Sequence, residues 1–244
     1  MNTQSNSYTF IYSSIIVVIV ATLLALMASA LKPAQEKNIE VEKKQNILAS
    51  LKVASTKNDA EKKYDEYIVD KYTINSNGEK VKNVDPFLVN MREELKKEPS
   101  ERNLPVFVSK KNDTTFLVFP VYGKGLWGPI WGYISLEPAQ KDTSLGKLVI
   151  KYSTIYGAFF DHKGETPGLG AEIATPRFQH EFVGKKLFDK QSDFIGIKVV
   201  KGGADPNSLN EVDAISGGTI TSKGVQAMMD TCLVSYKDFL RTEN

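Results

Sequence analysis

The chain has 244 residues, which is long enough for one globular domain with appended segments. Its 31 Lys and Arg residues nearly balance its 29 Asp and Glu residues, which argues against a surface that binds nucleic acid. The single cysteine, Cys232, excludes an intrachain disulfide and a cysteine-rich zinc or iron–sulfur site held by this chain alone. Two histidines, His162 and His180, are too few to indicate a metal site, and we expect none.

Residues 1–7 form a short tail without Lys or Arg, and an apolar segment without charge follows from Tyr8 to Leu31. As a helix, this segment would span about 36 Å, against a hydrocarbon core of roughly 30 Å. A cleaved signal peptide is the alternative, because the small residues Ala28-Ser29-Ala30 resemble a cleavage site. The length of the apolar run and the uncharged tail favour an uncleaved transmembrane helix at residues 8–31.

Basic residues follow this span on its C-terminal side, at Lys32, Lys37, Lys43 and Lys44. Taken alone, the positive-inside rule therefore puts the bulk of the chain in the cytoplasm.

Residues 32–100 form a connecting region that begins with a stretch rich in Lys, Glu, Gln and Asn. Apolar residues at partly helical spacing indicate a juxtamembrane helix, which lies either on a partner or membrane surface or free in solvent as a stalk. Asn77-Gly78, between Tyr67–Ile74 and Lys80–Val81, predicts a hairpin turn. Residues 85–103 predict a short polar helix and loop.

Residues 101–244 carry the pattern of an α+β domain in which a mainly antiparallel sheet is packed by helices. Strand-like runs with short turns are followed by a helical stretch to about Leu187, a strand at Phe194–Val200 and a final amphipathic helix. The strand-like runs are Pro105–Val108, Thr114–Val121, a segment that ends at Leu136, and Lys147–Tyr156. The segment Lys110-Lys-Asn-Asp113 predicts a turn that joins the first two runs. The final helix has one apolar face, comprising Val225, Met228, Met229, Cys232, Leu233, Tyr236 and Phe239.

A glycine pair flanked by hydroxyl residues precedes the final helix, in the segment Asp213-Ala-Ile-Ser-Gly-Gly-Thr219. Gly217 and Gly218 allow close approach of the backbone, and free N–H groups at a helix start favour an anion. The segment therefore reads as a phosphate cradle in which the Thr219 hydroxyl touches a phosphate or is esterified to one. An ordinary turn with a helix cap is the alternative, and we expect Thr221 or Ser222 to cap the helix.

A second glycine motif lies about fifty residues earlier, in the segment His162-Lys-Gly-Glu-Thr-Pro-Gly-Leu-Gly170. Taken alone, it is equally a Pro-Gly turn that leads into a helix. The loop around Trp127 and Trp131 is rich in glycine and aromatic residues, which would cover a planar ring, face a partner protein or simply fill the core at a strand corner.

The two glycine motifs resemble those of covalent FMN-binding domains, in which FMN is joined through its phosphate to the last threonine of Asp-x-x-Ser-Gly-x-Thr. The usual residue before that threonine is alanine, and this chain has Gly218. The resemblance implies that FMN is attached to Thr219 and that the chain has no catalytic residue of its own. The cofactor-binding residues that it implies are Asp213, Ser216, Gly217, Gly218, Thr221, Ser222, Glu165, Thr166, Gly168 and Leu169, with His162 and Trp127 as further candidates.

Together with the apolar helix and the Trp-Gly loop, the motifs resemble the NqrC family, the membrane-anchored flavin subunits of the sodium-translocating NADH:quinone oxidoreductases. The equivalent flavin subunit of the related Rnf complexes, RnfG, is the alternative. The resemblance implies an electron carrier without independent activity, which relays electrons from NADH towards quinone in a sodium-pumping respiratory complex. Its partners would be other membrane subunits, the lipid bilayer and a flavin transferase.

The same resemblance implies a single-pass protein of the inner membrane with its C-terminal domain on the periplasmic side. This conflicts with the positive-inside rule, and we adopt the orientation that the resemblance implies. A membrane-anchored flavin regulator or scaffold is the remaining alternative. The sequence indicates no NADH site in this chain, so electrons would arrive from and leave to partner subunits. Sodium is not expected in the span, because that segment contains no ionisable group except tyrosine.

Overall fold

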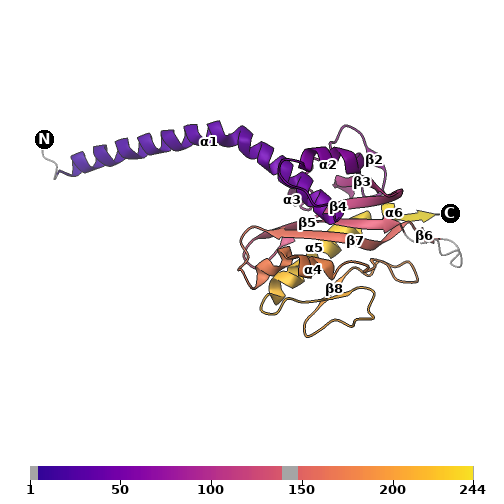
Figure 1. Ribbon diagram of the computed structural model, residues 1–244. Coiled ribbons are helices and arrows are strands. Elements are labelled where there is room, and N and C mark those ends of the chain that lie inside the picture. The colour runs from indigo at the N-terminus through magenta and orange to yellow at the C-terminus, as the bar shows by residue number, and fades with distance from the viewer. Residues whose placement is uncertain (1–4, 139–147, 244) are drawn as a thin grey trace. The chain divides into compact units, whose positions relative to one another are not determined.

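The computed structural model describes residues 5–138 and 148–243 (Figure 1). The chain divides into two compact units, Met1–Lys43 and Lys44–Asn244. The described part of the first unit belongs almost entirely to helix α1 (Asn6–Ser50), whose most apolar 18-residue window has a mean hydropathy of 2.7 and no buried residue. By length and composition α1 can cross a membrane, and the predicted span Tyr8–Leu31 lies within it. Residues 1–4 of the expected tail lie outside the described residues.

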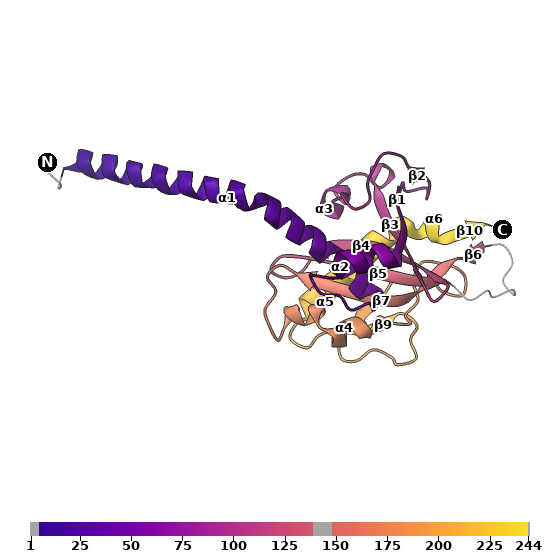
Figure 2. The ribbon, with the colours of Figure 1, turned by 45° about the horizontal axis from the view of Figure 1, so that its top comes forward.

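The second unit is built on a six-stranded antiparallel sheet with the strand order β2-β1-β3-β4-β5-β7 (Figure 2). The expected α+β class is confirmed, since every pairing in this sheet is antiparallel. Its strands are β1 (Ile68–Ile74), β2 (Lys80–Val81), β3 (Leu104–Lys111), β4 (Thr114–Lys124), β5 (Pro129–Pro138) and β7 (Tyr152–His162).

Two small strand pairs and several helices complete the unit. Strands β6 (Leu148–Ile150) and β10 (Arg241–Glu243) pair antiparallel, and β8 (Lys198–Val200) and β9 (Glu211–Asp213) pair parallel. The helices are α2 (Ala60–Tyr67), α3 (Met91–Glu94), α4 (Pro176–His180), α5 (Thr219–Leu233) and α6 (Lys237–Leu240), with single 3-10 turns η1 (Pro99–Glu101), η2 (Gly170–Ala174) and η3 (Val234–Tyr236).

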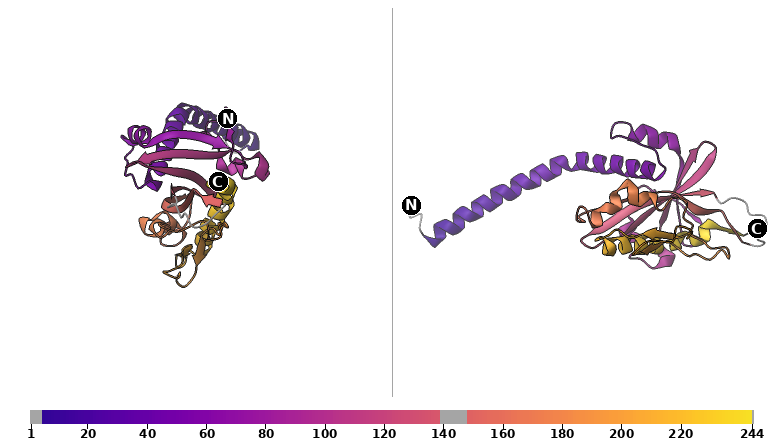
Figure 3. Two further views of the ribbon diagram at one scale, coloured as in Figure 1. Left: turned by 90° about the vertical axis from the view of Figure 1, so that its right-hand side faces the viewer. Right: turned by 60° about the horizontal axis from the view of Figure 1, so that its bottom comes forward.

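Side chains of β4 alternate between two hydrophobic cores because successive residues of a strand point to opposite faces of the sheet. Leu117 and Phe119 join the core under α5, whereas Phe116 and Val118 join the core formed with α2 and the end of α1. The yellow C-terminal segment accordingly lies on one side of the sheet (Figure 3). Both faces of the central strands are therefore covered.

Helix α5 presents its predicted apolar face to the sheet. Six of the seven residues expected on this face are buried, and the seventh, Phe239, packs partly buried beyond the helix end. Tyr236 lies in η3, directly after α5, and its hydroxyl donates a hydrogen bond of 2.9 Å to the Pro105 carbonyl of β3, which fixes this turn to the sheet.

The last residues of α1 belong to the second unit. Ile47 and Leu48 are fully buried in the core on that face. The Ser135 hydroxyl of β5 donates a hydrogen bond of 2.6 Å to the Ser50 carbonyl. The predicted juxtamembrane helix is thus present up to Ser50, and its end is part of the domain core.

Both predicted hairpin turns are present. Asn77-Gly78 joins β1 to β2, and Asn112 and Asp113 join β3 to β4 with positive φ angles of 48° and 60°. Positive φ at both central residues matches the right-handed twist of the two strands.

The helical stretch after Gly170 is shorter than predicted. Only η2 and α4 are helical there, because Thr175 is extended (ψ 146°) before Pro176, as the residue before a proline prefers. The strand expected at Phe194–Val200 is reduced to Lys198–Val200. The apolar run from Lys147 becomes β6 and β7, and Lys147 itself lies outside the described residues.

Candidate functional site

Thr219 is the first residue of α5, six residues after the end of β9, and is half-buried. The loop before it closes onto the first turn of the helix. The Ile215 N–H donates to Ser222 Oγ over 3.0 Å, and both the N–H and the hydroxyl of Ser222 donate to the Gly218 carbonyl. Gly218 is the residue that precedes the helix, and it supplies no side-chain cap.

The expected capping by Thr221 or Ser222 is therefore wrong. Both residues lie inside the first turn of α5 and are buried. Within the described residues, the N–H groups of Thr219, Ile220 and Thr221 have no hydrogen-bond acceptor, as expected for the first turn of a helix. They remain available to an anion at the Thr219 side chain.

The loop around Gly217 lies against the second glycine motif. Gly217 has a φ of 74°, and a Cβ added there would lie 2.5 Å from Leu169 Cδ2. A larger residue would be strained by its backbone and would also displace Leu169. The two motifs, about fifty residues apart in sequence, are thus in contact.

Glu165 joins three segments of the site. Its carboxylate is 4% exposed, and it accepts hydrogen bonds from the Thr221 hydroxyl (2.5 Å) and the Trp127 N–H (2.8 Å). Burial raises the pKa of this carboxyl, but the hydrogen bonds from Thr221, Trp127 and Gly128 and the charge of His162 outweigh it and lower the pKa. The carboxylate is therefore held ionised as an acceptor for its protein neighbours.

The rest of the second motif forms a turn stabilised by its own backbone. The Glu165 N–H donates to His162 Nδ1 over 3.2 Å, and the Leu169 N–H donates to the Thr166 carbonyl over 3.1 Å. Gly168 has a φ of 74°, and its N–H donates to Glu172 Oε1. The exposed side chains of Thr166 and Leu169 are left facing the cavities beside Thr219.

Thr219 lines two cavities. One, of about 270 Å³, lies between the Trp127 turn, the second motif and the start of α5. The other, of about 860 Å³, extends from Gly168 and Ser216 towards Arg177 and Lys201. The larger cavity falls in the volume range typical of small-molecule sites.

Several large apolar side chains near Thr219 are exposed to solvent. Trp127 is 71% exposed and Ile220 is 62% exposed, and Leu126 and Leu169 lie beside them. The sequence reasoning missed Leu126 and Ile220. Their positions directly beside the two motifs were the available signal.

Asp213 lies at the end of β9 and fixes the neighbouring loop. Its Oδ1 accepts a hydrogen bond of 2.5 Å from the Ala204 N–H, and its own N–H donates to Glu181 Oε2 over 2.8 Å. Burial raises the pKa of Glu181; the hydrogen bond from the Asp213 N–H opposes this shift, and the Asp213 charge adds to it. Glu181 was not expected at the site, because it lies far from both motifs in sequence.

Comparison with known proteins shows the family to which the chain belongs. The family model of the FMN-binding domain matches residues 125–234, which include both motifs. The NqrC subunit of the Na(+)-translocating NADH-quinone reductase of Haemophilus ducreyi is 30% identical over 240 residues, covering 92% of this chain and 88% of that protein. The chain belongs to the NqrC family of Na(+)-translocating NADH-quinone reductase subunits.

Other members agree with this assignment. The corresponding subunit of Vibrio vulnificus is 39% identical over 126 residues, which cover 51% of this chain and 44% of that protein. The crystal structure of the corresponding subunit from Parabacteroides distasonis superposes with a TM-score of 0.75 at 41% identity, covering 88% of this chain and 98% of that chain. NqrC from Shewanella oneidensis gives 0.66 at 26% identity, covering 85% and 97%. The NqrC family is thereby favoured over the Rnf alternative.

In this member of the NqrC family, the fold brings all the candidate residues from the two motifs and the Trp127 turn around the start of α5. Gly123–Gly128 has the Gly-x-Gly-x-x-Gly spacing of a dinucleotide-binding loop, but it joins the antiparallel strands β4 and β5, whereas that loop joins a strand to a helix. Among the described residues, no group of three or more His, Cys, Asp or Glu side chains is arranged to hold a metal ion. His180 is exposed.

Proposed function

We propose that FMN is attached to Thr219 through a phosphoester and that the chain relays electrons from NADH towards quinone as part of a sodium-pumping respiratory complex. The observation that carries the proposal is the position of Thr219. Thr219 begins a 15-residue helix whose first three N–H groups have no acceptor among the described residues. It also borders two cavities.

The residues present fit such a group. The helix start and the Gly217 backbone would hold the phosphate, since their N–H groups have no acceptor among the described residues, and the two glycines leave room for it. The exposed apolar side chains of Trp127, Leu169 and Ile220 would cover an isoalloxazine ring. FMN, once bound, supplies the ability to accept and pass on electrons.

Glu165 has a positioning role in this proposal. Its carboxylate holds the Trp127 backbone on one side and Thr221 of α5 on the other. The turn that carries Trp127 is thereby fixed beside Thr219. Thr166, Gly168 and His162 shape the same loop, and Asp213 and Ser216 shape the approach to Thr219 that a flavin transferase would use.

Covalent attachment is tested on a denaturing gel. The Thr219→Ala variant should lose flavin fluorescence that survives denaturation, because it lacks the acceptor hydroxyl. Thr221→Ala and Ser222→Ala should keep it, because those hydroxyls are bonded to Glu165 and Gly218 inside the first turn. Peptide mass spectrometry that puts the added mass on any residue other than Thr219 would refute the assignment.

For the membrane arrangement, we propose that α1 crosses the inner membrane once and that the domain lies on the periplasmic side with other membrane subunits of the complex. The apolar helix and membership of the NqrC family support this. External protease should then digest the domain in spheroplasts and spare it in intact cells. A domain that stays protected in spheroplasts would instead lie in the cytoplasm, as the positive-inside rule predicts from the lysines after α1.

A further inference from the structure

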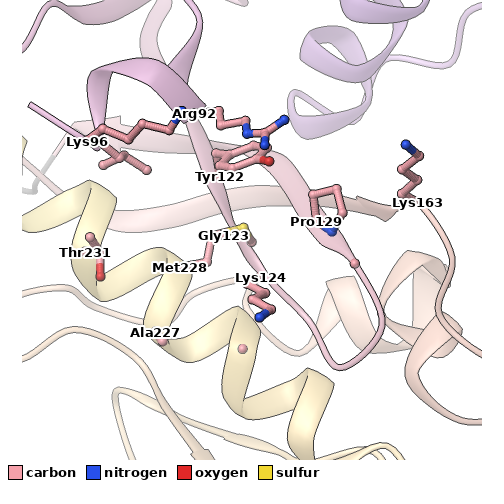
Figure 4. A pocket seen from close by; sticks show the side chains of 13 residues that line it. Arg92, Lys96, Tyr122, Gly123, Lys124, Pro129, Lys163, Ala227, Met228 and Thr231 are labelled. Atoms are coloured by element: carbon pink, nitrogen blue, oxygen red, sulfur yellow. The ribbon is translucent and has the colours of Figure 1, made fainter.

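A groove of about 700 Å³ lies beside the candidate flavin site, between the α3 segment, the end of β4 and α5 (Figure 4). Its floor is apolar and includes Tyr122, Pro129, Ala227 and Met228. The turn between β4 and β5 separates it from the smaller cavity at Thr219. Lys124 at the end of β4 and Gly128 of that turn line the groove, whereas Leu126 and Trp127 of the turn line the cavity.

The rim of the groove is positively charged. Arg92, Lys96, Lys124 and Lys163 line it, and no lining residue is acidic. Lys96 is paired with Glu93 at 2.8 Å, but Arg92, Lys124 and Lys163 are exposed and form no ion pair with any described residue. Figure 4 shows the side chains of Arg92, Lys124 and Lys163 arranged around the groove. This surface is complementary to an acidic partner.

The form of the groove favours a protein segment over a small anion. Small-molecule sites orient their ligand with a few convergent polar groups in an enclosed pocket. Here the cations come from three separate segments and stand at an open rim above an apolar floor. An apolar anchor flanked by charged contacts is the pattern of a protein–protein interface.

We propose that this groove is the docking site for an acidic segment of a partner protein in the complex. An apolar side chain of that segment enters between Tyr122, Pro129 and Met228, and its carboxylates meet Arg92, Lys124 and Lys163. The identity of the partner as an electron-exchanging subunit rests on the proposed function.

The position of the groove couples docking to the flavin site. Gly224 lines the groove and lies five residues after Thr219 on α5, which is about 7.5 Å along the helix axis. The β4–β5 turn borders both sites and is bonded to Glu165 through the Trp127 N–H. A partner in the groove therefore contacts the same helix and the same turn that form the flavin cavity.

Photocrosslinking in the intact complex tests the proposal directly. Ala227 is exposed at the groove and is replaced by p-benzoylphenylalanine; Lys198, exposed on β8, is the control position. Irradiation should join position 227, and not position 198, to a partner peptide rich in Asp and Glu. An adduct with lipid, an adduct with a neutral or basic peptide, or no adduct at position 227 would overturn the proposal.

Charge reversal gives a second measurement. Arg92→Glu, Lys124→Glu and Lys163→Glu together should weaken retention of the partner and slow electron transfer from NADH to quinone about tenfold or more, since each close charge pair becomes a repulsion. The matched control reverses Lys62, Lys190 and Lys198, which are exposed and have no ion pair within the described residues.

Equal behaviour of the two triple variants would contradict docking at the groove. The flavin is read separately, as fluorescence on a denaturing gel, and it should be retained in both variants. If the unmodified chain carries no flavin, the proposed function fails. The crosslink from position 227 still decides whether an acidic segment binds.

Discussion

At the scale of single residues, the carboxylate of Glu165 is where the three parts of the site meet. Replacing it with Ala leaves the buried Thr221 hydroxyl and the Trp127 N–H without their acceptor. We expect Glu165→Ala to lower the free energy of unfolding by about 2 to 3 kcal/mol. Glu165→Gln should cost less, because an amide oxygen still accepts from Trp127 and the hydroxyl can rotate. Urea unfolding followed by circular dichroism measures both, and equal costs would contradict the acceptor role.

The free energy of unfolding should also depend on pH through the ionisation of Glu165. The pKa of Glu165 is lowered from its ordinary value of 4.5, so ionisation of this carboxyl stabilises the folded chain. That stabilisation is complete above pH 4.5 and is lost as the pH falls through the lowered pKa. The gap in free energy of unfolding between the native chain and Glu165→Gln should therefore narrow below pH 4.5. A gap that stays constant from pH 7 to pH 3 would disprove this.

Cys232 should be unreactive in the folded chain. Burial raises its pKa to about 11 from the ordinary 9.0, even though the Tyr122 N–H donates to the sulfur. A buried neutral thiol is neither nucleophilic nor accessible. A maleimide reagent at pH 9 should label it only after denaturation, and rapid labelling of the native chain would show that α5 opens.

The residue types at the site were predictable, but several of their contacts were not. The local pattern around Thr219 left an ordinary turn and a phosphate cradle open, and the family resemblance favours the cradle. The expected capping role of Thr221 failed because its hydroxyl is bonded to Glu165, which is distant in sequence and reaches it only through the fold. Glu181 was overlooked for the same reason, since its contact with Asp213 is purely tertiary.

At the scale of elements, the junction between α1 and the sheet depends on close approach. A Cβ added at Gly157 of β7 would overlap the Ser50 carbonyl, which also accepts the Ser135 hydroxyl. We expect Gly157→Ala to destabilise the domain by about 2 kcal/mol, since either the helix end or the strand must shift. Gly164→Ala is the control, because a Cβ there meets nothing within 4 Å. Thermal unfolding compares the two, and similar melting temperatures would mean that the junction adjusts freely.

The strands were more predictable than the helices. Alternation of apolar residues and the turn pairs Asn77-Gly78 and Asn112-Asp113 indicate β1 to β4 directly. Residues 171–187 have a helical composition but form only short turns, because Pro176 interrupts them and Phe178 and Phe182 pack against Phe160 of β7. Tertiary packing there overrides local propensity.

At the scale of the molecule, the compact unit begins at Lys44, before the sheet itself. A chain starting at residue 44 should fold alone and remain soluble, since it keeps Ile47, Leu48 and Leu51, which fill the core with α2. A chain starting at residue 54 should melt several degrees lower or aggregate, because it uncovers that face of the sheet. Calorimetry and gel filtration distinguish the two outcomes. Equal stability would mean that the end of α1 contributes little.

The whole-molecule class was readable from the sequence, and the docking groove was not. The apolar segment and the order of strands and helices predict an anchored α+β domain. Arg92, Lys124 and Lys163, which form no ion pair among the described residues, lie on α3, at the end of β4 and after β7, and only the folded sheet assembles them. A nearly neutral composition gives no sign of such a local charge.

The position of α5 after all six strands of the main sheet also determines the order of events during folding on the ribosome. The strands are synthesised before the helix that covers one of their faces, so that face of the sheet stays uncovered until α5 has been made. Until then, the apolar side chains of that face depend on protection from aggregation. Thr219 acquires its place at a helix start at the same late moment, so the proposed attachment of FMN would follow the folding of this core.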